Sequence, residues 1–182
     1  MRLILATPVA LGLALAACGE SGGSADADGD GVISAEEMTA AVADREPLQP
    51  GMYQMSMELL ELEDPTMTPE ELEQGRAMFQ MIGSMAPAQC MTAEDLDGGM
   101  MDVAEQMQSG DCQITSMNTS GDTMNAEMSC QSDTGGTANV SLESTQTGTS
   151  SQMTMTASEE TEQGPKRLVM QIGLERTGDC TE

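Results

Sequence analysis

The sequence predicts an α+β protein that is mainly β, built as a curved antiparallel meander of about six strands, open and barrel-like, with one or two helices. Two observations predict this class. Apolar residues alternate with polar ones in separate short stretches, which is the spacing of half-buried strands. Glycine-containing turns separate the last five stretches, so consecutive strands are expected to connect as hairpins. A single EF-hand-like loop and helix precede the sheet.

The N-terminus is typical of an exported lipoprotein. Residues 1–17 combine a basic start with an apolar run that is too short to span a bilayer core of about 30 Å, so they are expected to form a signal peptide. The run ends in Leu15-Ala-Ala-Cys18, which resembles a bacterial lipobox, although an ordinary cleavage site is the alternative. Cys18 is therefore expected to carry lipid and residues 18–25 to form a flexible tether. No Asp follows Cys18, which favours an outer-membrane lipoprotein facing the periplasm or the cell surface.

Residues 26–37 match the EF-hand calcium loop D-x-[DN]-x-[DN]-G-x5-E at every specified position. Ca²⁺ takes oxygen ligands, and this spacing wraps them around one ion, with Gly31 at the sharp turn. An acidic linker is the alternative interpretation. The expected ligands, with the carbonyl of Val32 and a water-mediated contact from Ser34, are Asp26, Asp28, Asp30, Val32, Ser34 and Glu37.

The chain around this loop supports it on one side only. Residues 35–44 are expected to form the exiting helix, which ends before Pro47, so the loop and helix unit covers 26–46. The entering side is the flexible tether, and the sequence has no second loop to pair with the first. We therefore expect weak calcium affinity, with a dissociation constant of about 10⁻⁴–10⁻³ M.

Residues 47–182 are expected to form the disulfide-containing antiparallel β domain. Its first strand begins at Gly51, and a helix follows from the capping box of Thr68 and Glu71, with Pro69 at the first helical position. A second helical stretch is expected after the Thr92 cap, running to about residue 108. The inward positions of the six strands and of the first helix are expected to be Tyr53, Met55, Met57, Leu59, Leu72, Phe79, Ile82, Ile114, Met124, Ala126, Met128, Val140, Leu142, Met153, Met155, Ala157, Leu168, Met170, Ile172 and Leu174.

The four cysteines beyond Cys18 predict two disulfides, because an exported protein folds in an oxidising compartment. Four cysteines allow three connectivities. A hairpin that turns near residues 120–122 places Cys112 opposite Cys130, which leaves Cys90 to pair with Cys180. The spacing therefore favours Cys112–Cys130 and Cys90–Cys180.

Methionine supplies much of the apolar content. From Cys18 onward, Leu, Ile, Val and Phe account for 19 of 165 residues, below the roughly 20% under which a charged chain tends to be disordered. The 18 methionines of this stretch raise the count above that level. The Met-x-Met pairs at 55–57 and 153–155 place both side chains on one strand face, which favours core packing. The alternative is a methionine-based Cu(I)-binding or oxidant-handling periplasmic protein.

Several short motifs of the β domain carry a family resemblance. In chain order they are Gly51-Met-Tyr-Gln-Met-Ser-Met, Gln89-Cys-Met-Thr, Cys112-Gln-Ile-Thr, Ser120-Gly-Asp-Thr-Met, Met128-Ser-Cys, Met153-Thr-Met and Gly178-Asp-Cys. Residues 47–180 thereby resemble bacterial envelope proteins of domain-of-unknown-function family 3617. The resemblance implies secretion, two disulfides and a β-rich fold, with no catalytic residues to carry over. Tyr53 stands where a Trp is usual, and Glu175-Arg-Thr replaces a basic run.

Composition limits the function. With 6 Lys and Arg against 31 Asp and Glu, the chain has a formal net charge of -25, which argues against nucleic acid as a partner. The absence of His removes the Ser-His-Asp and Cys-His catalytic schemes and imidazole metal sites, so we expect no enzyme. The sequence predicts a calcium-binding, lipid-anchored envelope protein with a binding or scaffolding role. Its expected partners are the membrane, through the lipid, and an envelope protein that the sequence does not identify.

Overall fold

The computed structural model describes residues 25–96, 112–132 and 135–180. The signal peptide, Cys18, the tether up to residue 24 and most of the second expected helical stretch lie outside the described residues. The helices are α1 (Ala35–Val42) and α2 (Pro69–Met85). The strands are β1 (Gly51–Glu63), β2 (Gln89–Met91), β3 (Cys112–Ser120), β4 (Thr123–Gln131), β5 (Thr137–Gln146), β6 (Ser150–Thr161) and β7 (Gly164–Gly178).

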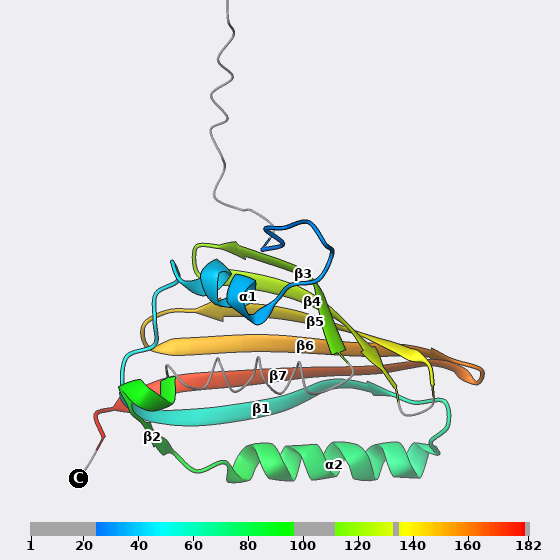
Figure 1. Ribbon diagram of the computed structural model, residues 1–182. Coiled ribbons are helices and arrows are strands. Elements are labelled where there is room, and N and C mark those ends of the chain that lie inside the picture. The colour runs from blue at the N-terminus through cyan, green and yellow to red at the C-terminus, as the bar shows by residue number, and fades with distance from the viewer. Residues whose placement is uncertain (1–24, 97–111, 133–134, 181–182) are drawn as a thin grey trace, which may run out of the picture.

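All seven strands form one antiparallel sheet in the order β2-β1-β7-β6-β5-β4-β3 (Figure 1). Strands β3 to β7 form a continuous meander, and β1 joins the sheet beside the last strand, β7. The mainly β, α+β class is therefore confirmed. The strand that the sequence does not predict is β2, because three residues are too few for an alternating pattern to be recognised.

The sheet is open, which corrects the expected barrel-like curvature. The outer strand on one side is β3. On the other side it is β2, which pairs only with Gly51–Tyr53, so the rest of β1 is also an edge. Closure would require these strands to pair with each other, but other parts of the chain already lie against the free edges of both β1 and β3. Covering an exposed edge in this way also prevents it from pairing with another chain.

Helix α2 covers the edge of β1 beyond the short β2 pairing (Figure 1). Arg76 Nη2 donates to the carbonyl of Leu62 at 2.9 Å, and Gln54 Nε2 donates to the carbonyl of Ala86, just past the helix, at 2.8 Å. Gly83 lies against the backbone of Met57. These contacts fix the helix alongside the strand.

Helix α2 and the second helical stretch both begin at the N-caps that the sequence predicts. Thr68 and Glu71 form a reciprocal capping box, and Pro69 occupies the first turn of α2. Thr92 and Asp95 make the same pair of contacts where the second helical stretch begins, at residue 93. Within α2 the predicted inward face is only partly correct, because Ile82 is 47% exposed. No helix among the described residues is long and apolar enough to cross a membrane.

The buried core joins the loop and α1 to the sheet. The main cluster combines two residues that precede or belong to α1 with four from β3, β4 and β5, namely Ile33, Met38, Met117, Ala126, Met128 and Leu142. Met153 and Met155 of β6 pack against this cluster. The β5 pairing places Met128 beside Val140, as the predicted inward alternation requires. Methionine therefore fills core positions that Leu and Ile occupy in most proteins.

The connection from α1 to β1 crosses the ends of the strands. Gln146 Nε2 donates to the carbonyl of Glu46 at 2.8 Å, and the N–H of Gln49 donates to the carbonyl of Gly148 at 2.8 Å. Tyr53, only 1% exposed, donates its hydroxyl to the carbonyl of Gln49 at 2.7 Å. This connection lets α1 lie over β3 although the next strand, β1, is near the other side of the sheet.

Candidate metal site

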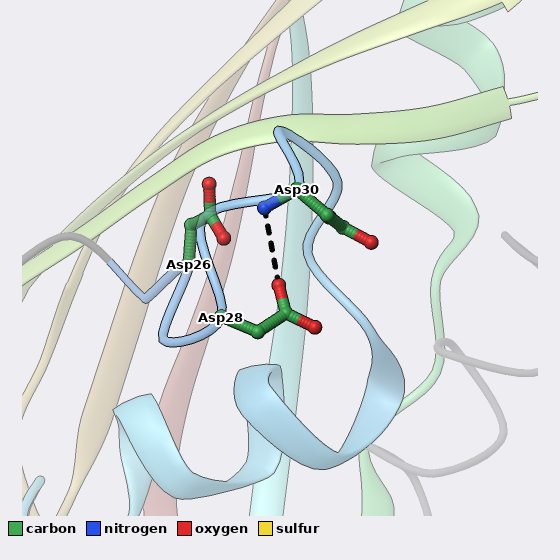
Figure 2. A group of neighbouring side chains, drawn as sticks. All are labelled: Asp26, Asp28 and Asp30. Carbon is green, nitrogen blue, oxygen red and sulfur yellow. Dashed lines mark hydrogen bonds between the residues drawn. The ribbon is translucent and has the colours of Figure 1, made fainter.

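Three aspartates converge in the loop before α1. Asp26, Asp28 and Asp30 each offer a carboxylate oxygen, and these atoms lie within 4.8 Å of one another (Figure 2). Asp28 and Asp30 are exposed, and Asp26 is half-buried. The structure thus brings together the three residues at positions 1, 3 and 5 of the predicted calcium loop.

Backbone hydrogen bonds to Asp26 shape this loop. Its Oδ1 accepts from the N–H of Gly29 at 2.7 Å, and its Oδ2 accepts from the N–H of Gly31 at 3.1 Å. Both glycines have positive φ, +75° and +83°, a conformation that side chains with a Cβ rarely adopt. The glycine at position 6 therefore has the turning role that the sequence pattern assigns to it.

The other two aspartates bind the backbone two residues ahead. Asp28 Oδ1 accepts from the N–H of Asp30 at 3.1 Å, and Asp30 Oδ1 accepts from the N–H of Val32 at 2.8 Å. Such local turns are characteristic of Asp and hold a loop without help from a regular element. They order the carboxylates along one short stretch of chain.

Glu37 connects the beginning and the end of the loop. Its Oε1 accepts from the N–H of Ala27 at 2.8 Å, while Oε2 accepts from the N–H and the hydroxyl of Ser34 at 2.9 and 2.8 Å. The Ser34 hydroxyl in turn accepts from the N–H of Glu37, which completes a capping box at α1. Hydrogen bonds from the Ser34 backbone, the Ser34 hydroxyl and the Ala27 backbone lower the pKa of Glu37 from 4.5 to about 2.

The remaining predicted ligands lie in the same stretch. Val32 is 37% exposed, and Ser34 is held at the helix N-cap. Glu37 is outside the group of three close carboxylates but reaches the loop at Ala27. The set consists of oxygen donors, most of them carboxylates, which is the chemistry that fits a hard divalent cation such as Ca²⁺.

Two residues outside the motif, Ile114 and Met117, support the loop with their backbone carbonyls. The N–H of Ala25 donates to the carbonyl of Met117 at 3.0 Å, and the N–H of Ile33 donates to the carbonyl of Ile114 at 2.8 Å. Both acceptors belong to the edge strand β3. The sequence pattern contains no signal for these contacts, because any residue type can offer a backbone carbonyl.

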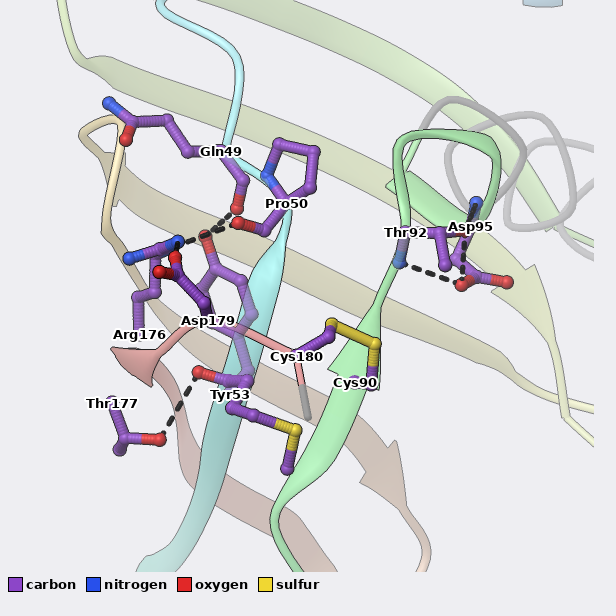
Figure 3. The surroundings of a disulfide bond; sticks show 11 residues. Gln49, Pro50, Tyr53, Cys90, Thr92, Asp95, Arg176, Thr177, Asp179 and Cys180 are labelled. Atoms are coloured by element: carbon purple, nitrogen blue, oxygen red, sulfur yellow. Dashed lines mark hydrogen bonds and ion pairs between the residues drawn. A yellow bond between two sulfur atoms is a disulfide. The ribbon is translucent and has the colours of Figure 1, made fainter. Parts of the chain in front are cut away.

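The structure contains the two disulfides that the spacing favours. Cys112 and Cys130 lie directly opposite each other on β3 and β4, and Cys90 of β2 joins Cys180 near the chain end (Figure 3). Close to the second bridge, Arg176 pairs with Asp179 and donates from Nε to the carbonyl of Pro50 at 3.0 Å. The bridges thus tie both terminal strands of the sheet.

The geometry defines the class: a disulfide-linked antiparallel β-sheet protein with an acidic, glycine-turned loop packed on its edge strand. Residues 48–180 match the family model described as "Protein of unknown function (DUF3617)", and the chain belongs to this family. The match begins after α1, so the acidic loop precedes the part that the family model covers. Comparison with curated proteins and with solved structures finds no match.

Proposed function

We propose that this chain is a calcium-binding, lipid-anchored envelope protein whose role is binding or scaffolding, without enzymatic activity. The observation that carries the proposal is the convergence of Asp26, Asp28 and Asp30 at the EF-hand spacing, with their oxygens within 4.8 Å of one another. Three neighbouring carboxylates repel each other, and a divalent cation among them relieves that repulsion.

The loop has further oxygen atoms for the ion. The Glu37 carboxylate supplies the acidic group of position 12, and the Val32 carbonyl and Ser34 supply positions 7 and 9. Because its pKa is lowered to about 2, Glu37 is ionised throughout the physiological pH range and needs to lose no proton on binding. We expect a dissociation constant of about 10⁻⁴–10⁻³ M, a range that suits proteins outside the cytosol.

Calorimetry on the mature chain in detergent, with both disulfides formed, tests the calcium site. Calcium titrated to millimolar concentration is expected to give saturable heat with the natural chain and none with Asp26→Ala/Glu37→Ala. The matched control is Glu36→Ala/Asp44→Ala, which removes two charges from the same segment at exposed positions outside the ligand set and is expected to retain binding. The proposal fails if the natural chain gives no more heat than Asp26→Ala/Glu37→Ala.

The lipid anchor rests on the lipobox, which lies outside the described residues. Mass spectrometry of the mature N-terminus is expected to find acyl chains on Cys18. Cys18→Ser is expected to release the protein from the membrane fraction without loss of calcium heat. A membrane-bound Cys18→Ser protein would contradict the anchor and leave the calcium site to be judged by calorimetry.

A further inference from the structure

The segment of residues 25–45, here called the N-terminal segment, is attached to the β3–β4 hairpin at several points between its two ends. Its loop is held at both ends by the hydrogen bonds from Ala25 to Met117 and from Ile33 to Ile114. The three aspartates of the candidate site lie between these two attachment points. The loop is therefore fixed to the edge strand of the sheet on both sides of these aspartates.

Side-chain packing joins the segment to the same strands. Ile33 is 5% exposed and Met38 7% exposed, and both belong to one cluster with Met117, which is 1% exposed. Ile33 lies between the expected ligands Val32 and Ser34, and Met38 directly follows Glu37. The buried contacts thus begin one residue away from the residues that would hold the ion.

The end of α1 is tied to the hairpin as well. Thr119 Oγ1 donates to the carbonyl of Ala41 at 3.0 Å, and Arg45 Nη2 donates to the carbonyl of Asp122 at 2.9 Å. Thr119 is the penultimate residue of β3, and Asp122 lies in the turn to β4. The segment therefore runs along β3 from Ile114 to the hairpin turn and covers one free edge of the open sheet.

We propose that calcium in the loop regulates how firmly the N-terminal segment holds the edge of β3, so that the ion controls the protection of this side of the sheet. This inference rests on the proposed calcium site. A ligand that binds the attached conformation and not the detached one shifts the balance between them by a factor of 1 + [L]/Kd. At a calcium concentration ten times the dissociation constant, detachment becomes about tenfold rarer.

Hydrogen exchange followed by mass spectrometry on the mature chain tests this regulation. Amides of the N-terminal segment, including those of Ala25 and Ile33, and amides of β3 are expected to exchange about tenfold more slowly in calcium at ten times the measured dissociation constant than in chelator. Peptides from β1 and α2, on the other side of the sheet, serve as the internal reference and are expected to change less. The Glu36→Ala/Asp44→Ala variant is expected to respond like the natural chain.

A variant that loosens the segment without touching the ligands gives a second test, because calcium is then expected to restore the attached conformation. Thr119→Val removes the tie to the carbonyl of Ala41 and leaves the loop and the core untouched. In chelator its N-terminal segment is expected to exchange about two- to fivefold faster than that of the natural chain, in line with the loss of one modest hydrogen bond, and calcium at ten times the dissociation constant is expected to slow this exchange about tenfold. Ile33→Thr keeps every ligand but weakens the packing, so a larger acceleration of exchange is expected if this variant folds.

The outcomes separate the two proposals. If calorimetry detects calcium binding but exchange in the N-terminal segment and β3 is the same with and without calcium, the regulation is overturned and the calcium site stands. If calorimetry detects no binding, the calcium site itself is overturned, and the regulation with it. Exchange in the N-terminal segment of Thr119→Val that calcium fails to slow, although the variant binds calcium, would overturn the regulation as well.

Discussion

Gly83 of α2 lies directly against the carbonyl oxygen of Met57 in β1, at a position where a Cβ would overlap that oxygen. The missing side chain lets the helix approach the strand backbone and cover its free edge. The glycine has ordinary helical φ, so the fold needs it because it lacks a side chain and not because of its backbone freedom.

Replacing this glycine is expected to destabilise the protein. Gly83→Ala forces the helix away from β1, and overpacking of this kind typically costs about 1–3 kcal/mol, of which the roughly 1 kcal/mol that Ala gains over Gly in a helix offsets only a part when the overlap is as severe as here. The matched control is Gly75→Ala, whose nearest neighbour is the flexible end of Leu62 at 3.2 Å, so it is expected to be neutral or stabilising. Urea unfolding measures both variants, and a Gly83→Ala protein as stable as the natural chain would contradict the close approach.

The two disulfides are expected to contribute unequally to stability. Cys112 and Cys130 are 18 residues apart, and Cys90 and Cys180 are 90 apart. In the chain-entropy model the shorter loop contributes about 3 kcal/mol and the longer about 4–5 kcal/mol. Denaturation of the paired Cys→Ala variants is expected to show the greater loss for Cys90→Ala/Cys180→Ala, and the reverse order would show that local strain or unfolded-state structure outweighs loop entropy.

Glu37 is expected to titrate near pH 2 in the calcium-free protein. Ionised Glu37 accepts from Ser34 and Ala27, so folding lowers its pKa and the associated stability is complete above about pH 4.5 and is lost as the pH falls toward 2. Ser34→Ala removes the hydroxyl donor but keeps the backbone donors, so the pKa is expected to rise part of the way toward 4.5. Carboxyl-carbon NMR titration checks this, with Glu71 of the corresponding capping box as an internal comparison whose lowered pKa stays unchanged.

Tyr53 offers a test of the core at the other side of the sheet. It is the single tyrosine of the chain, and burial raises its pKa above the ordinary 10.0. Ionising Tyr53 would place a charge at a buried position, which destabilises the folded protein. The corresponding stability is therefore present below about pH 10 and is lost as the pH rises through the raised pKa. The absorbance of tyrosinate, followed during alkaline titration, is expected to rise later in the natural chain than after urea unfolding, and identical curves would mean that the ring is not buried.

The methionine pairs are expected to act through packing rather than copper binding. Met153 and Met155 lie against the core cluster, where an apolar side chain of similar volume can replace each. Met153→Ile/Met155→Ile is expected to change the free energy of unfolding by less than about 1.5 kcal/mol for each substitution. Titration with Cu(I) is the check: stoichiometric binding by the natural chain that disappears in this folded variant would favour the copper alternative.

Local signals in the sequence predict much of the secondary structure correctly. The capping box of Thr68 and Glu71 starts α2 as predicted, because a cap involves residues three apart and needs no distant partner. The turn around Gly121 sets the register of the adjoining ends of β3 and β4, and a one-residue register shift between Ile114 and Ser116 then places Cys112 opposite Cys130. By contrast, the three residues of β2 become a strand only through pairing with Gly51–Tyr53. Local patterns in the sequence do not report such pairing.

For the candidate site, the sequence by itself determines the order and spacing of the acidic groups, since the positions of Asp26, Asp28, Asp30 and Glu37 are a property of the chain. It also predicts the glycine turn, which depends on one residue's backbone. Only the tertiary structure decides that the loop is supported by Ile114 and Met117. Backbone carbonyls are the same for every residue type, and their use depends on which strand the fold brings beside the loop. The sequence predicts a loop without support on its entering side. In the folded protein the loop is held on both sides, by Met117 at Ala25 and by Ile114 at Ile33.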